Sequence, residues 1–243
     1  MKFSIIHPSR SRPDKSYVTI SKWLSMATNL SDIKAYVSID VDDQENEKYV
    51  DLFVRHAQSH VNLCTNKNRS AVDAINNAAI SAYAEWADIL VVVSDDTDCF
   101  LGWDAAILNE VKNKKDWILK TQDGIQDYII TMPVLDSIYY DRLVKLQGGL
   151  YHPGFEHLFC DTYLTCQADI LGRKLTSDLM FRHNHYSNSV GKEGPDELHK
   201  RNDATWSQGE ELFIKLMKEF TPDQLSRITN VSMRNWLKMK RVL

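Results

Sequence analysis

Cysteine and glycine are scarce in this 243-residue chain, and neither is spaced as a familiar binding motif requires. The four cysteines form no Cys-x-x-Cys pair and lie in or beside apolar runs. We therefore expect buried thiols in a reducing compartment and no disulfide framework. No lysine-containing, glycine-rich phosphate loop follows the first apolar run, and this argues against nucleotidyl transfer.

Long apolar runs and an excess of positive charge are also missing. No stretch approaches the roughly 20 apolar residues of a membrane span, and the amino end is too weakly apolar for a signal peptide. We therefore expect a cytoplasmic protein without a membrane span. The net charge of −4 argues against a protein that coats nucleic acid through phosphate contacts alone. The length suits one α/β domain with a smaller C-terminal appendage.

The most informative stretch is WADILVVVSDDTDCFLGWD, residues 86–104. Its five apolar residues, 89–93, predict a strand buried on both faces, as in a parallel sheet with helices on either side. Asp95, Asp96 and Asp98 follow this run, where ligands bind in open α/β sheets. A hard cation such as Mg²⁺ or Mn²⁺, shared with substrate phosphates, would explain three clustered carboxylates. The alternative is an acidic turn that caps the next helix.

Apolar runs and helical periodicity predict the other elements of the fold. Strands are expected over residues 3–6, 35–39, 61–64, 117–121 and 174–182, and helices from residue 13 and over 45–57, 71–86 and 103–112. Asp123-Gly124 predicts a hairpin with a returning strand over 128–131, and Pro133 predicts the first turn of a helix. We expect a Rossmann-like α/β fold, with a mostly parallel central sheet and helices on both faces.

Polar side chains are predicted at several strand ends. Arg10 follows the first strand, and its planar guanidinium matches phosphate oxygens, although a solvated loop arginine is the alternative. Asp40 ends the second strand and could accept from a base N–H or a ribose hydroxyl. His183 and His185 alternate along a strand, so both could face one ligand. Asp161 lies near a helix start, where the alternative is a carboxylate favoured by the helix dipole.

Taken in order, these segments resemble the nucleotide-sugar glycosyltransferases of the GT-A fold, and the family 2 type most closely. The likeness covers roughly residues 2–190. It rests on the Pro-Ser-Arg loop, the Asp40 region, NRSAVDAINNAA, VVVSDDTDCFLGWD, TQDG, TMPVLDSIYY, YHPGF with FCDTYLT, and FRHNHY. The resemblance implies a GT-A domain over residues 1–190, with residues 191–243 as a C-terminal loop and helical extension packed on the same domain.

The resemblance also implies roles for individual residues. Asp96 and Asp98 would form the Asp-x-Asp metal motif for Mn²⁺ or Mg²⁺, and His183 or His185 would add a further metal ligand. Asp161 would be the general base on the acceptor side. The implied nucleotide-binding residues are Pro8, Ser9, Arg10, Asp40, Arg69, Asn76 and Asp96.

Some positions depart from the family pattern. IDVDD replaces the usual Asp-Asp-Gly-Ser turn, so the sequence does not decide which carboxylate binds the nucleotide base. Ser94 stands where an aspartate is usual, so the metal register could be Asp95-Asp96 instead of Asp96-Asp98. The Gln-x-x-Arg-Trp motif of processive synthases is absent, which favours transfer of one sugar over polymer extrusion.

The resemblance thus implies a metal-dependent glycosyltransferase, with direct displacement that inverts the anomeric carbon. It would move one sugar from a nucleotide-diphosphate donor, with a UDP-sugar favoured, to an acceptor hydroxyl. The sequence does not decide whether the acceptor is a glycan, a small molecule or a modified DNA base. Two alternatives remain, namely a sugar-phosphate nucleotidyltransferase and a non-catalytic sugar- or nucleic-acid-binding module on the same fold.

Overall fold

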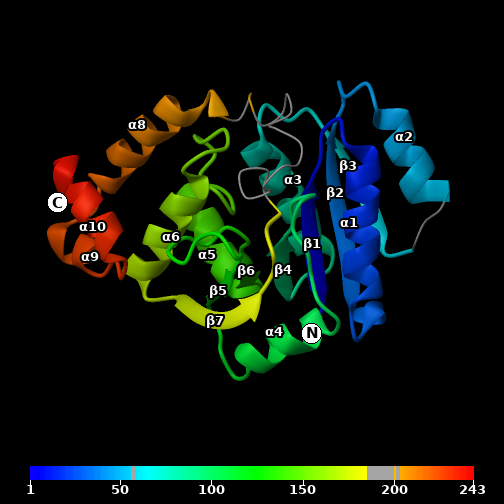
Figure 1. Cartoon of the computed structure of the whole chain (residues 1–243), viewed down its shortest axis with the longest axis horizontal. Coiled ribbons are helices and arrows are strands. Elements are labelled where there is room, and N and C mark those ends of the chain that lie inside the picture. Colours follow the sequence, from blue (N-terminus) through cyan, green and yellow to red (C-terminus); the bar gives the residue numbers. More distant parts are fainter. Residues whose placement is uncertain (56–58, 185–199, 201–202) are drawn as a thin grey trace.

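A seven-stranded sheet forms the centre of the computed structural model, which describes residues 1–55, 59–184, 200 and 203–243 (Figure 1). The strand order is β3-β2-β1-β4-β6-β5-β7. Strand β6 pairs antiparallel with β4 and β5, whereas the other pairs are parallel. The mostly parallel sheet is therefore confirmed. The strands are β1 Phe3–Pro8, β2 Ile33–Asp40, β3 Val61–Asn66, β4 Ile89–Val92, β5 Ile118–Gln122, β6 Val134–Asp136 and β7 Lys174–Met180.

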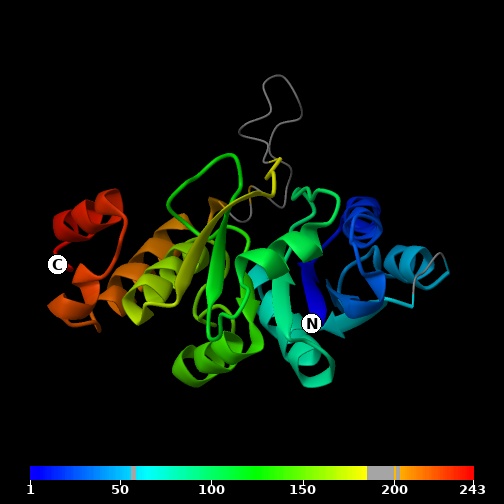
Figure 2. The same cartoon turned by 90° about the horizontal axis from the view of Figure 1, so that it is seen from below.

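Helices cover both faces of this sheet, as predicted (Figure 2). Those before β6 are α1 Pro13–Ser25, η1 Leu30–Asp32, α2 Asn46–Val50, η2 Asp51–Arg55, α3 Ala71–Glu85 and α4 Trp103–Glu110. Those after it are α5 Ser137–Gln147, α6 Cys160–Leu171, α8 Trp206–Met217, α9 Pro222–Ser226 and α10 Val231–Met239. Helices α1 and α2 lie at one end of the molecule and α8 to α10 at the other (Figures 1 and 2). None of the described helices is long and apolar enough to cross a membrane.

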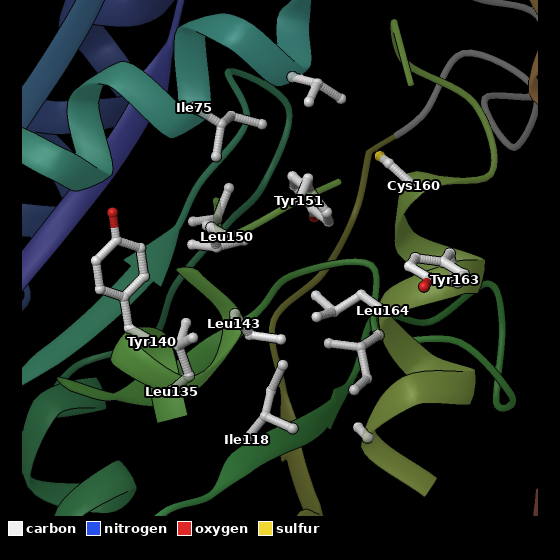
Figure 3. Close-up of a cluster of buried hydrophobic side chains, with 14 of the residues drawn as sticks. Ile75, Ile118, Leu135, Tyr140, Leu143, Leu150, Tyr151, Cys160, Tyr163 and Leu164 are labelled. Carbon is white, nitrogen blue, oxygen red and sulfur yellow. The ribbon is translucent and has the colours of Figure 1, made fainter. Parts of the chain in front are cut away.

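Strand β4 separates two apolar cores because its side chains alternate between the faces. Ile89 and Val91 pack with α1 and α4, where Trp23 contacts Trp103 edge to face. Leu90 belongs to the opposite core, together with residues of α3, α5 and α6. Figure 3 shows part of this second core, in which side chains from these helices converge over β5. The continuous apolar run in the sequence reflects burial on both faces.

The segment after β5 differs from the sequence prediction. No strand forms over residues 128–131, because Asp123 closes a loop instead of a hairpin turn. The Asp123 carboxylate accepts from the backbone N–H groups of Ile125 and Gln126, both at 2.7 Å, and from the Thr131 hydroxyl at 2.9 Å. Pro133 precedes β6, so the expected helix begins later, at Ser137. The hairpin and the early helix start were therefore wrong.

The C-terminal helices share the second core with α6. Phe213 and Met217 of α8 and Leu237 of α10 are fully buried in it. Helix α8 approaches closely at Gly209, where an added Cβ would lie 2.6 Å from the Leu158 carbonyl oxygen. The division at residue 190 lies outside the described residues and stays a prediction. All four cysteines are free thiols, and Cys160 and Cys166 are buried.

Candidate functional site

The carboxyl ends of β1 and β2 place charged side chains beside one another. The backbone N–H of Ser9 donates to the Ser38 carbonyl at 2.9 Å, which continues the β1–β2 pairing into the loop. The Arg10 guanidinium binds the Asp40 carboxylate and also Asp42, with Nη1 2.8 Å from its Oδ1. These two carboxylates raise the pKa of Arg10. The loop arginine is therefore anchored at the strand ends, together with Pro8 at the end of β1.

Asp40 also connects this edge to the loop before α3. Asn68 donates its Nδ2 hydrogen to Asp40 Oδ1 at 2.6 Å, and Asn77 donates to Asn68 Oδ1 at 2.8 Å. Asn68 was not singled out in the sequence, and its only signal was a polar loop after a predicted strand. The neighbouring Arg69 is exposed and pairs with Asp73, with Nε 2.7 Å from Oδ2.

Asn76 lies apart from this edge, on the buried face of α3. Its Nδ2 donates to the Tyr151 carbonyl at 2.9 Å, and its Oδ1 accepts from the Tyr151 N–H at 3.0 Å. A Cβ on Gly149 would lie 2.7 Å from the Asn76 amide, so this contact requires glycine. The side-chain amide therefore fastens α3 to residues 149–151, and its nucleotide-binding role stays a prediction.

The loop after β4 is held against α1 by a second arginine. Arg12 Nη1 lies 3.1 Å from both carboxylate oxygens of Asp95. The Tyr49 hydroxyl accepts from the Arg12 backbone N–H at 3.1 Å and lies 2.6 Å from the Ser9 hydroxyl. The two arginines of the first loop thus hold carboxylates from β2 and β4 on either side of Ser9. Each of these guanidinium groups is therefore paired with carboxylates at the carboxyl edge of the sheet.

His7 joins β1, β4 and α1 beneath this edge, and sequence inspection missed it. Its Nδ1 lies 2.7 Å from the Val93 carbonyl and its Nε2 lies 2.9 Å from the Ser16 hydroxyl. A carbonyl only accepts, so Nδ1 carries the proton and Nε2 accepts from Ser16. Burial lowers the pKa of His7 despite the nearby Asp95 and Asp96. A neutral histidine therefore positions the start of the aspartate loop.

Asp96 and His183 face each other between β4 and the segment after β7. His183 Nε2 lies 3.1 Å from Asp96 Oδ2, and an antiparallel bridge joins Thr97 to His183. Burial lowers the pKa of His183, but the bond to Asp96 and the charges of Asp96, Asp123 and Asp161 outweigh it and raise the pKa. The structure thus brings together two predicted ligands that are 87 residues apart in the sequence. His185 lies outside the described residues.

Asp98 is held by partners on two sides. Lys22 Nζ lies 2.6 Å from its Oδ1, and the Asn184 amide donates to its Oδ2 at 3.0 Å. Although burial acts to raise the pKa of Asp98, these two hydrogen bonds and the charge of Lys22 lower it. Asp98 is therefore an ionised carboxylate at neutral pH, at the same edge as Asp96.

Asp161 occupies the first turn of α6, across from the aspartate loop. Its Oδ1 accepts from the Thr162 N–H at 2.6 Å and from the Thr162 hydroxyl at 3.2 Å. Burial raises its pKa above the usual 3.8, while these bonds and the charge of His183 act in the opposite direction. The preceding Phe159 has a left-handed backbone, with φ +70°, which is rare for a residue with a side chain. The carboxylate thus combines a raised pKa with a strained, tightly packed backbone.

No protein-family model matches the sequence, and no curated protein is significantly similar to it. Solved structures do match. The structure of S. aureus TarS 1–349 with UDP-GlcNAc has a TM-score of 0.64 and 12% identity, covering 93% of this chain and 69% of that chain. A mannosyltransferase from Pyrobaculum calidifontis with GDP-Man and Mn²⁺ has a TM-score of 0.57 and 10% identity, covering 99% and 84%.

A longer TarS structure has a TM-score of 0.63 and 11% identity; the match covers 93% of this chain but only 41% of that one. These neighbours are GT-A-type glycosyltransferases with low sequence identity to this chain. The chain has the GT-A fold. The GT-A expectation drawn from the order of the sequence motifs is thereby confirmed. The residue roles that accompanied it stay predictions.

The carboxyl edge of this GT-A sheet fits a divalent cation at the Asp96–His183 pair. Two adjacent ligands of an octahedral Mg²⁺, each at about 2.1 Å, lie about 3 Å apart. The 3.1 Å between Asp96 Oδ2 and His183 Nε2 is a hydrogen-bond distance, and a bound ion would take the place of that hydrogen bond. Among the described residues, no group of three or more His, Cys, Asp or Glu side chains is already arranged around one point. Magnesium is commonly held by one or two carboxylates with substrate phosphates as further ligands, so two protein ligands meet its needs.

Proposed function

We propose that this GT-A chain is a metal-dependent, inverting glycosyltransferase. It moves one sugar from a nucleotide-diphosphate donor to an acceptor hydroxyl. The observation that carries the proposal is the pairing of Asp96 with His183 at the edge where two arginines also converge. The complexes of TarS with UDP-GlcNAc and of the mannosyltransferase with GDP-Man and Mn²⁺ support this donor class.

The donor would bind along the carboxyl ends of β1 and β2. Asp40, held by Asn68, would accept from the base or ribose, as an anchored carboxylate suits N–H and O–H donors. Arg10 would bind the diphosphate through its planar guanidinium. Pro8 and Ser9 would shape the loop that approaches the nucleotide, with Ser9 fixed by Tyr49. We do not extend this role to Arg69 or Asn76. Arg69 pairs with Asp73 of α3, and Asn76 binds the main chain of Tyr151.

Asp96, Asp98 and His183 would hold Mn²⁺ or Mg²⁺ beside that diphosphate. When bound, the ion neutralises charge that develops on the departing diphosphate, which is worth several kcal/mol. Lys22 now pairs with Asp98 and Arg12 with Asp95, so these two cations hold the loop carboxylates in place. Burial acts to raise the pKa of Asp98, but the contact with Lys22 helps to lower it, and metal coordination requires an ionised carboxylate.

Asp161 would remove the proton from the acceptor hydroxyl. A general base works best when its pKa approaches the working pH, and burial moves Asp161 in that direction. The bond from the Thr162 N–H orients one oxygen and leaves Oδ2 for the acceptor. Attack by the deprotonated oxygen at the anomeric carbon, opposite the leaving diphosphate, inverts the configuration. We also propose a cytoplasmic location, which the four free thiols support.

A thermal-shift panel tests this proposal directly. Nucleoside diphosphates and nucleotide sugars are each added with and without Mn²⁺, because a ligand that binds only the folded state raises the melting temperature by mass action. We expect at least one nucleotide sugar to stabilise the protein, and Mn²⁺ to increase the effect. Stabilisation by a nucleoside triphosphate with a sugar phosphate, and by no nucleotide sugar, would instead indicate a nucleotidyltransferase. No response to any nucleotide would contradict both.

A further inference from the structure

A pocket of about 500 Å³ lies over β5 and β7, away from the aspartates that follow β4. Its floor is built from the sheet, since Lys120 of β5 is the register partner of Thr176 of β7. Lys174 lies two residues before Thr176 and so shares the same face of the sheet. The end of α6 and the segment between α9 and α10 form the walls. Its lining residues are Lys120, Asp127, Tyr128, Ala168, Asp169, Gly172, Lys174, Thr176, Thr229 and Asn230.

Lys120 is the unusual residue of this pocket. It is only 3% exposed, and within the described chain its ammonium has neither a hydrogen-bond acceptor nor an ion-pair partner. A buried ammonium without an acceptor is unfavourable, so such groups are normally paired. Burial accordingly lowers the pKa of Lys120, although the charges of Asp123 and Asp127 act to raise it.

The nearby carboxylates are occupied elsewhere. Asp169 binds Lys174, with 2.6 Å between Oδ1 and Nζ, and accepts from the Thr229 N–H at 2.9 Å. Asp123 accepts from two backbone N–H groups and from Thr131 within its own loop. Among the described residues, Lys120 therefore has no direct carboxylate partner in the pocket, because Asp123 and Asp127 act on it only through their charge, and an anion of a ligand would bind its ammonium directly.

We propose that this pocket is a second ligand site, in which Lys120 binds a carboxylate or phosphate group of a small hydroxylated anion. Asp127 offers an acceptor for the hydroxyls of that ligand, Asn230 offers the N–H donors of its side-chain amide because its oxygen caps α10, and Thr176 offers a hydroxyl beside Lys120. The volume is in the range of small-molecule sites, about 300–1,000 Å³. The α6 wall of the pocket lies at the other end of that helix from Asp161, about 12 Å away at about 1.5 Å per residue, whereas Tyr128 of the pocket is close enough for the charge of Asp161 to help raise its pKa, after burial. This inference does not depend on glycosyl transfer.

Titration with two simple anions tests the site. Protein labelled with [ε-¹³C]lysine is titrated by NMR with inorganic phosphate and, separately, with malonate, without divalent ions. We expect one of the anions to shift the Lys120 signal and to raise the pKa of its ammonium; the stronger ligand distinguishes phosphate from carboxylate chemistry. Lys120→Met identifies the signal by its loss. Calorimetry, which does not depend on that signal, should show that the variant binds the anion about tenfold or more weakly, because a buried charge partner is removed.

Matched variants make the outcome decisive. Lys15→Met removes an exposed lysine of α1 and should leave anion binding unchanged. Lys120→Met should fold with an unchanged or higher melting temperature, because it removes an unpartnered buried charge. Thr176→Val keeps Lys120 and should still weaken binding, which gives a second reading of the same site. The proposal is overturned if the Lys120 signal ignores both anions, or if Lys120→Met binds them as tightly as the wild type.

Discussion

Asp161 is the residue on which the transfer step depends. Its carboxylate is half-buried in the first turn of α6, and desolvation raises its pKa. We predict that Asp161→Asn folds and binds the donor with unchanged affinity, but transfers sugar about 10²- to 10⁴-fold more slowly, as loss of a general base does. Calorimetry measures donor affinity and a product assay measures transfer. Asp141→Asn, at an exposed ion pair on α5, is the control, and wild-type turnover in Asp161→Asn would refute the assignment.

Thr162 should tune the pH dependence of that base. Its hydroxyl donates to Asp161 Oδ1 at 3.2 Å and so favours the ionised carboxylate. Thr162→Val removes this bond and should raise the pKa of Asp161 further above its usual 3.8. Because the base works only when ionised, the acid limb of the rate profile should move to higher pH, while the rate on the plateau is unchanged. Thr65→Val, at an exposed strand position, is the control and should keep the wild-type profile. If the profile of Thr162→Val also coincides with that of wild type, this would count against Asp161 as the base.

Asp96 and Asp98 should both contribute to metal-dependent donor binding. Asp96 faces His183, and Asp98 is ionised at the same edge. We predict that Asp96→Asn and Asp98→Ala each weaken nucleotide binding in the presence of Mn²⁺ and have little effect in its absence, which calorimetry with and without the ion measures. If Asp98→Ala binds the nucleotide with unaltered affinity in the presence of Mn²⁺, the metal motif would be Asp95-Asp96 instead of Asp96-Asp98.

At this scale the sequence indicated residue types better than it indicated contacts. Asp96, Asp98 and one of His183 and His185 were predicted to share a metal ion, and the structure places Asp96 and His183 within 3.1 Å of each other. Asn68 and Asn76 were harder to separate, because both are asparagines close to the start of α3. Only the fold shows that Asn68 reaches Asp40 while Asn76 binds the main chain of Tyr151. A side-chain amide suits either partner, so its chemistry alone does not decide its role.

At the scale of elements, α8 supports the start of α6. Gly209 lies in α8 where an added Cβ would be 2.6 Å from the Leu158 carbonyl oxygen. Alanine favours a helix over glycine by about 1 kcal/mol, yet overpacking a close contact costs about 1–3 kcal/mol. We therefore predict that Gly209→Ala lowers the free energy of unfolding and slows transfer, because the displaced contact lies three residues from Asp161. Denaturant titration and a product assay measure the two effects.

Ser207→Ala is the matched control for this helix, since Ser207 lies two residues before Gly209 at an exposed position and its replacement meets no backbone. It should leave both measurements close to wild type. If Gly209→Ala is instead more stable than wild type, helix propensity outweighs the close contact. The inference that α8 constrains the start of α6 would then be wrong.

Long elements were predictable from periodicity, whereas short ones were not. Strand β4 was evident because burial on both faces produces an unbroken apolar run. Strand β6 has only three residues, too few to show any period, and Pro133 before it resembled a helix start. The loop after β5 was mistaken for a hairpin because Asp-Gly is a strong turn signal. Here the aspartate side chain, not the backbone, closes the loop.

At the scale of the molecule, one sheet supports two cores, and the C-terminal helices belong to one of them. Figure 1 shows α8 to α10 beside α6, and the buried residues of these helices form one cluster with those of α3 and α5. Neither a family model nor a curated protein matches the sequence, yet the order of motifs along the strands still predicted the GT-A fold. The order of motifs is informative because ligands of open α/β sheets bind at the carboxyl ends of the strands. The surface between those ends can change without loss of the fold.

A core residue of α8 tests whether the chain unfolds as a unit. Phe213 is fully buried against Phe159 and Trp236, so Phe213→Ala should cost about 3–5 kcal/mol through lost burial and a cavity. Because its cluster extends to β4, we predict that hydrogen exchange in β1 and β4 accelerates along with exchange in α8. Ile80→Ala, at a position 54% exposed, should change the free energy of unfolding by less than about 0.5 kcal/mol. Faster exchange confined to α8, α9 and α10 would instead show that these helices unfold separately and that the sheet is stable without them.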